Sequence, residues 1–413
     1  MLYSHKSFEV TTAMDFFPDC KAFGWHRIEN DGRVIGFPGR FEPYRPTGGN
    51  CLRSFDEMYS EEHRIRDLQE GKPPLFRTIV QQSIQTGIRY LLNFYYFMKP
   101  ALPASLRSAV RRYHAIPLKW TSASTWPINK ASGGKPANWP GWPDGKQFAF
   151  VLSHDVEGKK GLERSRSLAE LEMKLCYRSC FNFVPEGEYE TPRELRTFLT
   201  ENGFEVGVHD LHHDGSLYRS QDVFDKSALK INQYLDDWNA VGFRSGFMRH
   251  DLDWISKLHI RYDASTFDSD PFEPQPDGMQ TIFPFWVRRP DETTYLELPY
   301  TLAQDSTLFL VLREKNDDVW KRKLAWIADH GGMAFVIVHP DYMEMEGTSS
   351  PREYDADLYR NFLKYTREKY GDTAWFARPC DVERYLRYHF PSEGNVERPY
   401  MPASRTMPAR QIR

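Results

Sequence analysis

The spacing of hydrophobic and polar residues changes near residue 148. Beyond that point, short apolar runs alternate with segments whose apolar residues recur every three to four positions; examples of the runs are FAFVLS (148–153), FEVGVH (204–209) and MAFVIVH (333–339). Runs of this length are typical of buried strands, and the longer period is typical of helices that pack on them. The pattern predicts an α/β fold with a largely parallel sheet.

The first 145 residues do not show this alternation. Residues 1–74 are rich in Gly, Pro and aromatic side chains, residues 75–116 have a helical pattern, and a Trp- and Pro-rich stretch follows. We expect an N-terminal extension over residues 1–145, in which the Trp-rich stretch forms a strap. The α/β domain is expected over residues 146–390, and a mobile tail over residues 391–413.

Charge and apolar content exclude some classes of protein. The chain has 413 residues with 54 basic and 57 acidic side chains, a net charge of −3, so no overall field favours nucleic acid. The first 20 residues contain no apolar leader, and no stretch reaches the roughly 18 apolar residues of a membrane span. These features predict a cytoplasmic protein without a signal peptide or transmembrane helix.

Residues 84–113 are the one segment whose composition suggests a lipid surface. Aromatic and aliphatic residues there lie beside Arg107, Arg111 and Arg112, as in helices that rest on a membrane interface. The alternative is that the apolar face of this segment packs on the rest of the protein, and the sequence favours packing. A peripheral membrane contact through residues 84–113 remains the second expectation.

Polar residues with metal-binding and acid–base chemistry follow the apolar runs. Asp155 and Glu157 come at the end of the first run, and because side chains alternate along a strand they share one face while His154 points to the other. His209 and His213 end and follow another run, with the spacing of one helical turn, which would aim both rings at a common point.

Two further runs end in the same way. Arg244 follows NAVG, and His339 ends MAFVIV. Since the carboxyl ends of parallel strands meet at one edge, these side chains are expected to lie together. One carboxylate and two imidazoles bind a divalent ion and leave a position open, while the second carboxylate takes a proton from water. Arg244 would orient that base, and His339 would protonate a leaving nitrogen.

These motifs resemble the polysaccharide deacetylase family (carbohydrate esterase family 4, the NodB homology domain). SHDVEG (153–158) is similar to its first motif, which implies that Asp155 is the catalytic base and Glu157 a metal ligand. HDLHH (209–213) is similar to the second motif and implies that His209 and His213 are the other ligands. In this chain Glu157 stands where the family usually has Asp.

The remaining motifs are supportive. RSGF (244–247) resembles the third and points to Arg244, with Gly246 at the family's Pro position, and FVIVH (335–339) resembles the fifth and points to His339. The family's fourth motif supplies an Asp that tunes the acid His. YDASTFDSDPF (262–272) offers three candidates for it, in chain order Asp263, Asp268 and Asp270, and Asp263 is our first choice.

The resemblance implies a fold, a cofactor and an activity. The fold is a distorted (β/α) barrel of about seven parallel strands over roughly residues 146–390. The cofactor is a divalent metal ion, Zn²⁺ before Co²⁺ or Ni²⁺, and the reaction is removal of N-acetyl groups from an N-acetylated glycan. Two alternatives stay open: a catalytically inactive, glycan-binding domain of a polysaccharide-assembly system, and a deacylase of a small amide or ester.

Overall fold

The structure is a computed structural model of the chain, and it describes residues 26–28, 34–36, 104–275, 277–345, 347 and 350–391. The expected irregular segment (residues 1–74) lies almost wholly outside these residues. Residues 75–103 of the expected helical segment and residues 392–413 of the expected tail also lie outside them. The domain boundaries that the sequence suggests stay predictions.

Two compact units make up the chain, residues 1–110 with 407–413, and residues 111–406. In the first unit, strands β1 (His26–Ile28) and β2 (Val34–Gly36) pair antiparallel. Helix α5 (Ala104–Thr121) begins in the first unit and ends in the second. None of the helices within the described residues is both long and apolar enough to cross a membrane.

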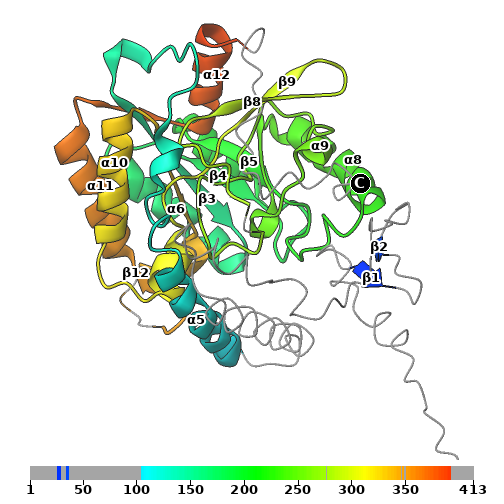
Figure 1. Cartoon of the computed structure of the whole chain (residues 1–413), viewed down its shortest axis with the longest axis horizontal. Helices are drawn as coiled ribbons and strands as arrows, with labels where there is room; N and C mark the ends of the chain where they lie inside the picture. Colours follow the sequence, from blue (N-terminus) through cyan, green and yellow to red (C-terminus); the bar gives the residue numbers. More distant parts are fainter. Residues whose placement is uncertain are drawn as a thin grey trace, which may run out of the picture. The chain divides into compact units, whose positions relative to one another are not determined.

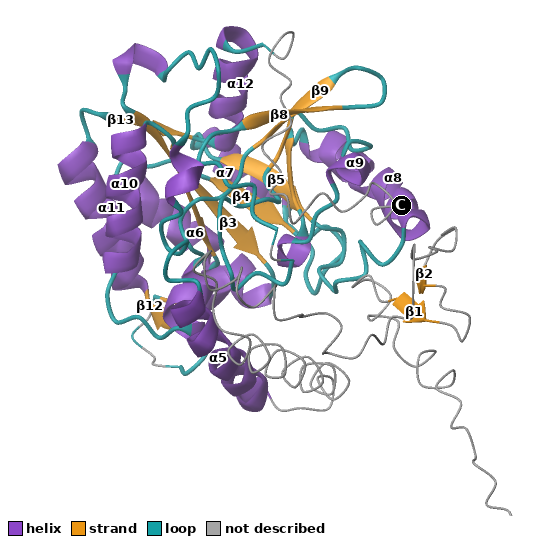
Figure 2. Cartoon of the chain, in the orientation of Figure 1, coloured by secondary structure: helices purple, strands orange, loops and turns teal. Residues whose placement is uncertain are grey.

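A mostly parallel sheet forms the centre of the larger unit (Figures 1 and 2). Its strands run in the order β10–β3–β4–β5–β6–β7–β9–β8, and β13 pairs with the first half of β3. All neighbours are parallel except β8 and β9. The strands are β3 (Phe148–Val156), β4 (Cys180–Phe183), β5 (Glu205–His209), β6 (Gly242–Arg244), β7 (Tyr262–Asp263), β8 (Phe285–Arg288), β9 (Thr294–Glu297), β10 (Met333–Val338) and β13 (Ala374–Ala377).

The chain beyond β9 connects the far side of this sheet back to β10. The backbone N–H of Tyr300 donates to the carbonyl of Thr266 after β7 (2.9 Å). The N–H groups of Thr301 and Leu302 both donate to the carbonyl of Phe335 on β10 (3.2 and 3.1 Å). The parallel strands β3, β4, β5, β6, β7, β9 and β10, with β13 beside β3, therefore curl into a distorted (β/α) barrel, which confirms the expected fold class.

Helices cover the outside of this barrel. All nine residues of β3 are buried, as expected for a central strand covered on both faces. Packing between helices completes the layer: Trp320 of α10 lies against Phe362 of α11, with ring centroids 4.9 Å apart. The helices are α6 (Lys159–Lys174), α7 (Arg193–Glu201), α8 (Gln221–Trp238), α9 (Leu252–Ile255), α10 (Asp318–His330), α11 (Ala356–Tyr370) and α12 (Pro379–His389).

Shorter elements lie in the loops. They are the helical turns η3 (Lys130–Gly133), η4 (Pro143–Gly145), η5 (Gly246–Met248), η6 (Ser306–Val311) and η7 (Pro340–Tyr342), and the paired strands β11 (Met343–Glu344) and β12 (Tyr354–Asp355). The Trp-rich strap packs at the amino ends of the strands. Its buried Trp142 donates from Nε1 to the carbonyl of Gly331, just before β10 (2.8 Å).

Candidate functional site

The polar end of β3 meets β6 inside the barrel. Arg244, the last residue of β6, donates to Ser153 Oγ (3.0 Å) and lies 3.7 Å from Asp155 Oδ2. Asn182 Nδ2 on β4 donates to Asp155 Oδ1 (3.0 Å). His154 points to the opposite face, where its Nε2 lies 2.8 Å from Glu172 Oε1 of α6. The alternation of side chains predicted for this strand is confirmed.

The charge on Asp155 follows from these neighbours. Burial alone would raise the pKa of its carboxyl, but the positive charge of Arg244, helped by His209 and His339, outweighs burial and lowers that pKa below its usual value. Asp155 is therefore a buried carboxylate that is ionised at neutral pH. Such a group can accept a proton from a molecule beside it.

Glu157, His209 and His213 form a cluster that could hold a metal ion. One ligand atom from each lies within 4.8 Å of the other two. His209 Nδ1 lies 3.1 Å from the carbonyl of Arg244, so Nδ1 carries the ring proton and Nε2 presents its lone pair. His209 Nε2 is buried and makes no hydrogen bond to any described residue, and His213 Nε2 lies 3.3 Å from Glu157 Oε1. This is a donor set that a divalent transition ion accepts.

The loop after β5 brings the two rings together without a helix. β5 ends at His209, and the backbone then turns through left-handed conformations at Asp210 (φ 57°) and His213 (φ 54°). The ring centroids of the two histidines lie 4.8 Å apart. The predicted convergence of the rings is confirmed, and the predicted helical turn is wrong. Residues other than Gly in this conformation cost free energy and are found more often at functional sites.

Gly246 explains why the third motif departs from its usual form. A Cβ atom at this position would lie 2.5 Å from Asp210 Oδ2 and 3.0 Å from His213 Cδ2. A residue with a Cβ, Pro included, would have to displace the side chains of Asp210 and His213. Glycine here allows the close approach of those two side chains.

Asp341 and Tyr342, which follow His339 in the sequence, hold Glu157 in place. The Tyr342 hydroxyl donates to Glu157 Oε2. Asp341 accepts the backbone N–H of Glu157 (2.9 Å), Gly158 (2.8 Å) and Gly161 (3.1 Å), and so caps the start of α6 from a distant part of the chain. Burial would raise the pKa of Glu157, but His213 and then His339 hold that pKa well below its usual range.

His339 is held as a cation. Its Nδ1 lies 2.6 Å from Asp305 Oδ1, its backbone N–H donates to Asp305 Oδ2 (2.8 Å), and its Nε2 lies 3.8 Å from Glu157 Oε1. Burial alone would lower the pKa of His339, but the charge and hydrogen bond of Asp305 outweigh it and raise that pKa to about 10. His339 can therefore act as a proton donor at neutral pH.

The Asp beside His339 corrects the sequence-based assignment. Asp263 at the end of β7 accepts from Ser265 Oγ (2.7 Å) and lies opposite Glu297 of β9. Asp268 pairs with Lys323 (2.5 Å), and Asp270 accepts from Tyr300 (3.0 Å). Asp305 occupies the place expected for Asp263, because the chain after β9 runs beside β10 and brings residue 305 to His339.

Comparisons with known proteins find likeness in structure alone. No family model matches the sequence, and neither does any curated protein. Among the solved chains, 26 match. One, assigned as a polysaccharide deacetylase from Mycobacterium smegmatis, has 18% identity and a TM-score of 0.48, over 62% of this chain and 95% of that one.

Two other matches have similar coverage. The Puue allantoinase has 14% identity and a TM-score of 0.49, over 64% of this chain and 99% of its own. The peptidoglycan deacetylase PdaC from Bacillus subtilis has 11% identity and a TM-score of 0.36, over 60% of this chain and 99% of its own. These likenesses concern the fold.

A sequence signal for Asp305 does exist. The apolar run YLELPYT (295–301) is followed by LAQD, so Asp305 comes after a strand-like segment, as Asp155 and His339 do. Applying the strand-end rule to this run would have brought Asp305 into the site. Asp341 and Tyr342 come two and three residues after His339, so they lie at the same edge of the sheet.

Proposed function

We propose that this chain is a metal-dependent hydrolase of an amide C–N bond whose substrate is an N-acetylated carbohydrate. One observation carries the proposal. The ligand cluster Glu157, His209 and His213 lies beside an ionised carboxylate, Asp155, and a protonated imidazole, His339. A base and an acid in opposite protonation states next to a metal-ligand set are the parts that amide hydrolysis needs.

The three ligands fit a divalent ion with an open position. Zinc accepts one carboxylate and two imidazoles, and catalytic zinc sites keep a fourth position for water or substrate. When bound, such an ion would polarise a carbonyl and lower the pKa of water. Co²⁺ and Ni²⁺ suit the same oxygen and nitrogen donors.

The residues around the cluster have separate roles in this proposal. Asp155, held ionised by Arg244, takes a proton from the attacking water. The hydrogen bond from Arg244 to Ser153 holds the guanidinium beside Asp155, and Asn182 orients the carboxylate. His339, held cationic by Asp305, donates its Nε2 proton to the departing nitrogen, because amine expulsion requires a proton.

The substrate class rests on the motifs SHDVEG, HDLHH, RSGF and FVIVH, which resemble those of polysaccharide deacetylases. Glu157 is one methylene longer than the Asp that the family usually has, so an inactive glycan-binding domain stays the second candidate function. A deacylase of a small amide or ester is the third. The acetate-release experiment described below distinguishes the three.

The metal site is tested first by metal content. His209→Ala with His213→Ala should remove bound Zn²⁺ from the purified protein, because two of three ligands are lost. His212→Ala is the matched control, since this exposed histidine of the same loop lies against the carbonyl of Glu186 (3.0 Å). Full metal content in the double variant would end the proposal.

The reaction is tested by acetate release from N-acetylglucosamine and N-acetylgalactosamine oligomers, with and without a chelator. We expect release that the chelator abolishes and that added Zn²⁺, Co²⁺ or Ni²⁺ restores. Binding of these glycans without release under all three ions would favour the inactive domain. Release only from small amides or esters would move the substrate away from glycans.

A further inference from the structure

Helix α5 carries an exposed apolar stripe. Tyr113, Ile116 and Trp120 lie three and four positions apart, on one face of the helix, with exposed fractions of 79%, 50% and 78%. Six large apolar side chains are exposed within the described residues, and three of them form this stripe. Gathering such side chains on one helix face marks an interaction surface.

The charge of α5 is entirely positive. Its 18 residues, ASLRSAVRRYHAIPLKWT, contain three arginines and one lysine and no Asp or Glu. Arg112 directly precedes Tyr113, so a basic residue flanks the stripe. A surface of opposite charge is therefore the partner that this helix complements.

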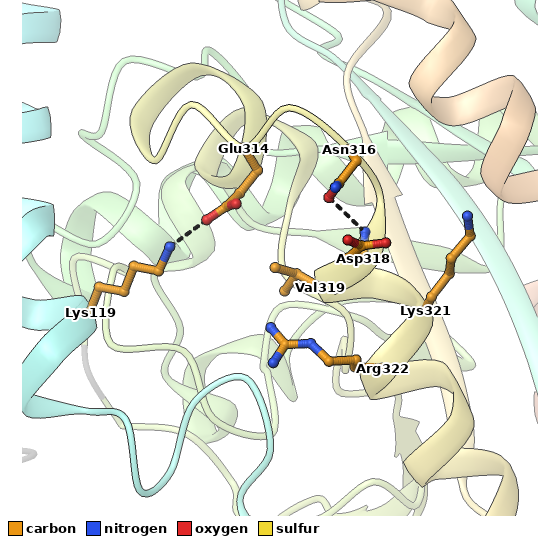
Figure 3. Close-up of a pocket in the computed structure, with 7 residues that line it drawn as sticks. All are labelled: Lys119, Glu314, Asn316, Asp318, Val319, Lys321 and Arg322. Atoms are coloured by element: carbon orange, nitrogen blue, oxygen red, sulfur yellow. Dashed lines mark hydrogen bonds and ion pairs between the residues drawn. The ribbon is translucent and has the colours of Figure 1, made fainter.

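The other face of α5 is anchored to the larger unit. Ala115 is buried, and Lys119 forms an ion pair with Glu314 (Figure 3). That pair borders a polar cavity of about 400 Å³ lined also by Asn316, Asp318 and Arg322. Glu314 follows η6, which begins directly after Asp305, so α5 is fixed on the side of the barrel that carries the candidate site. The stripe is thus held outward by packing on its opposite face.

We propose that α5 docks this protein on an anionic lipid surface. Trp and Tyr rings prefer the interface between headgroups and acyl chains, and Ile116 adds apolar area that enters it. The flanking side chain of Arg112 lies at the depth of the lipid phosphates. This inference does not depend on the proposed hydrolase activity. It places the contact at Tyr113–Trp120, which begins at the last residue of the segment 84–113 that the sequence suggested.

Vesicle flotation of the full chain tests the proposal. We expect the protein to float with vesicles of phosphatidylcholine and phosphatidylglycerol and to stay behind with phosphatidylcholine alone. Raised salt should release it, because the charge contribution is screened. Absence of flotation with the anionic vesicles would overturn the proposal.

The stripe is tested by replacing its three side chains. Tyr113→Ser, Ile116→Ser and Trp120→Ser together should weaken vesicle binding at least about tenfold, since the inserted apolar area is lost. The matched control is Leu229→Ser with Tyr388→Ser, which removes side chains that are 69% and 82% exposed on α8 and α12. Equal losses in the two variants would contradict docking through α5.

The basic flank is tested separately. Arg112→Gln should weaken binding about fivefold, because this arginine adjoins the stripe. Lys226→Gln removes one exposed charge from α8 and should leave binding unchanged. Circular dichroism checks that each variant remains folded.

Two other occupants of the stripe would give different results, and each would overturn the proposal. If a second copy covers it, size-exclusion chromatography shows a dimer that the triple Ser variant converts to a monomer, without vesicle binding. If an earlier segment of this chain covers it, the triple Ser variant lowers the melting temperature and the unchanged protein does not float.

Discussion

Two of the polar clusters within the described residues lie at opposite ends of the barrel strands. At the carboxyl ends lie Glu157, His209 and His213; at the amino ends lies the cluster around Glu205, the first residue of β5. Glu205 accepts from the Tyr262 hydroxyl (2.8 Å) and from the backbone N–H of Cys380 on α12 (3.0 Å). Glu205 is buried and Glu157 half-buried, and the two carboxylates differ in what surrounds them.

The difference lies in hydrogen bonding. Both oxygens of Glu205 have a donor, whereas the Nε2 atom of His209 has no hydrogen-bond partner among the described residues. A satisfied cluster stabilises the fold, and an unpaired buried nitrogen costs free energy unless a ligand uses it. Buried polarity alone therefore does not identify a site; an unpaired nitrogen beside further ligand atoms is the stronger indication.

The largest effect is expected from Asp155→Asn. The amide cannot accept the proton, so turnover should fall by roughly 10²–10⁴-fold while the three ligands still hold metal. Acetate release and metal content, measured on the same preparation, check this. Loss of metal in Asp155→Asn would show that Asp155 and Glu157 have exchanged roles.

Glu205→Ala should affect stability and leave metal binding intact. It removes the acceptor for Tyr262 and Cys380, and each buried donor left unpaired costs about 1–3 kcal/mol, so the free energy of unfolding should fall by roughly 2–4 kcal/mol. Urea unfolding measures this. A loss of metal content in this variant would contradict the separation of the two clusters.

Glu205→Gln sharpens the same test through pH. Burial raises the pKa of Glu205, so the folded protein binds this proton more tightly than the unfolded chain. Its stabilising contribution is complete below the pKa of an unfolded Glu, about 4.3, and is lost as the pH rises through the folded pKa. The Gln variant lacks this loss, so its unfolding free energy should gain on that of the unchanged protein as the pH rises.

Gly161→Ala should disturb the site indirectly, by displacing Asp341. An added Cβ would overlap the Asp341 carboxylate, whose two oxygens together accept three backbone N–H groups. Such crowding costs about 1–3 kcal/mol, and the better helix propensity of Ala returns at most about 1 kcal/mol. We expect a net loss of unfolding free energy and weaker metal binding. Gly134→Ala, with open space around it, is the control and should change little.

The smallest effect is expected from Tyr342→Phe. Removing the hydroxyl frees one oxygen of Glu157 without removing a ligand. Loss of such a supporting hydrogen bond weakens metal binding by about 10–100-fold, and we expect the lower end because Asp341 still holds the backbone. Titration with Co²⁺, followed by its absorption spectrum, measures this. An unchanged affinity would mean that Tyr342 only packs against His339.

Strand-end chemistry was predictable because it depends on local alternation. The positions of Asp155, Glu157 and His154 follow from the period of two along β3, and the fold class follows from the alternation of apolar runs with helical segments. His339 follows in the same way from the end of β10.

What could not be predicted depends on long-range closure and rare backbone conformations. A strand-like run before Asp305 indicates that it lies at the site edge, but its pairing with His339 depends on the chain after β9 hydrogen-bonding to β10, which no local pattern encodes. The convergence of His209 and His213 uses left-handed backbone at Asp210, where the sequence suggested a helical turn. The cap that Asp341 provides to α6 likewise joins segments about 180 residues apart.

One carboxylate, that of Asp341, holds the amide protons of Glu157, Gly158 and Gly161. These three amides should therefore exchange with deuterium at rates that rise and fall together, because a single displacement of Asp341 exposes all of them to solvent. Exchange at three neighbouring amides thus reports whether the support of the ligand loop is in place in protein that carries neither metal nor substrate.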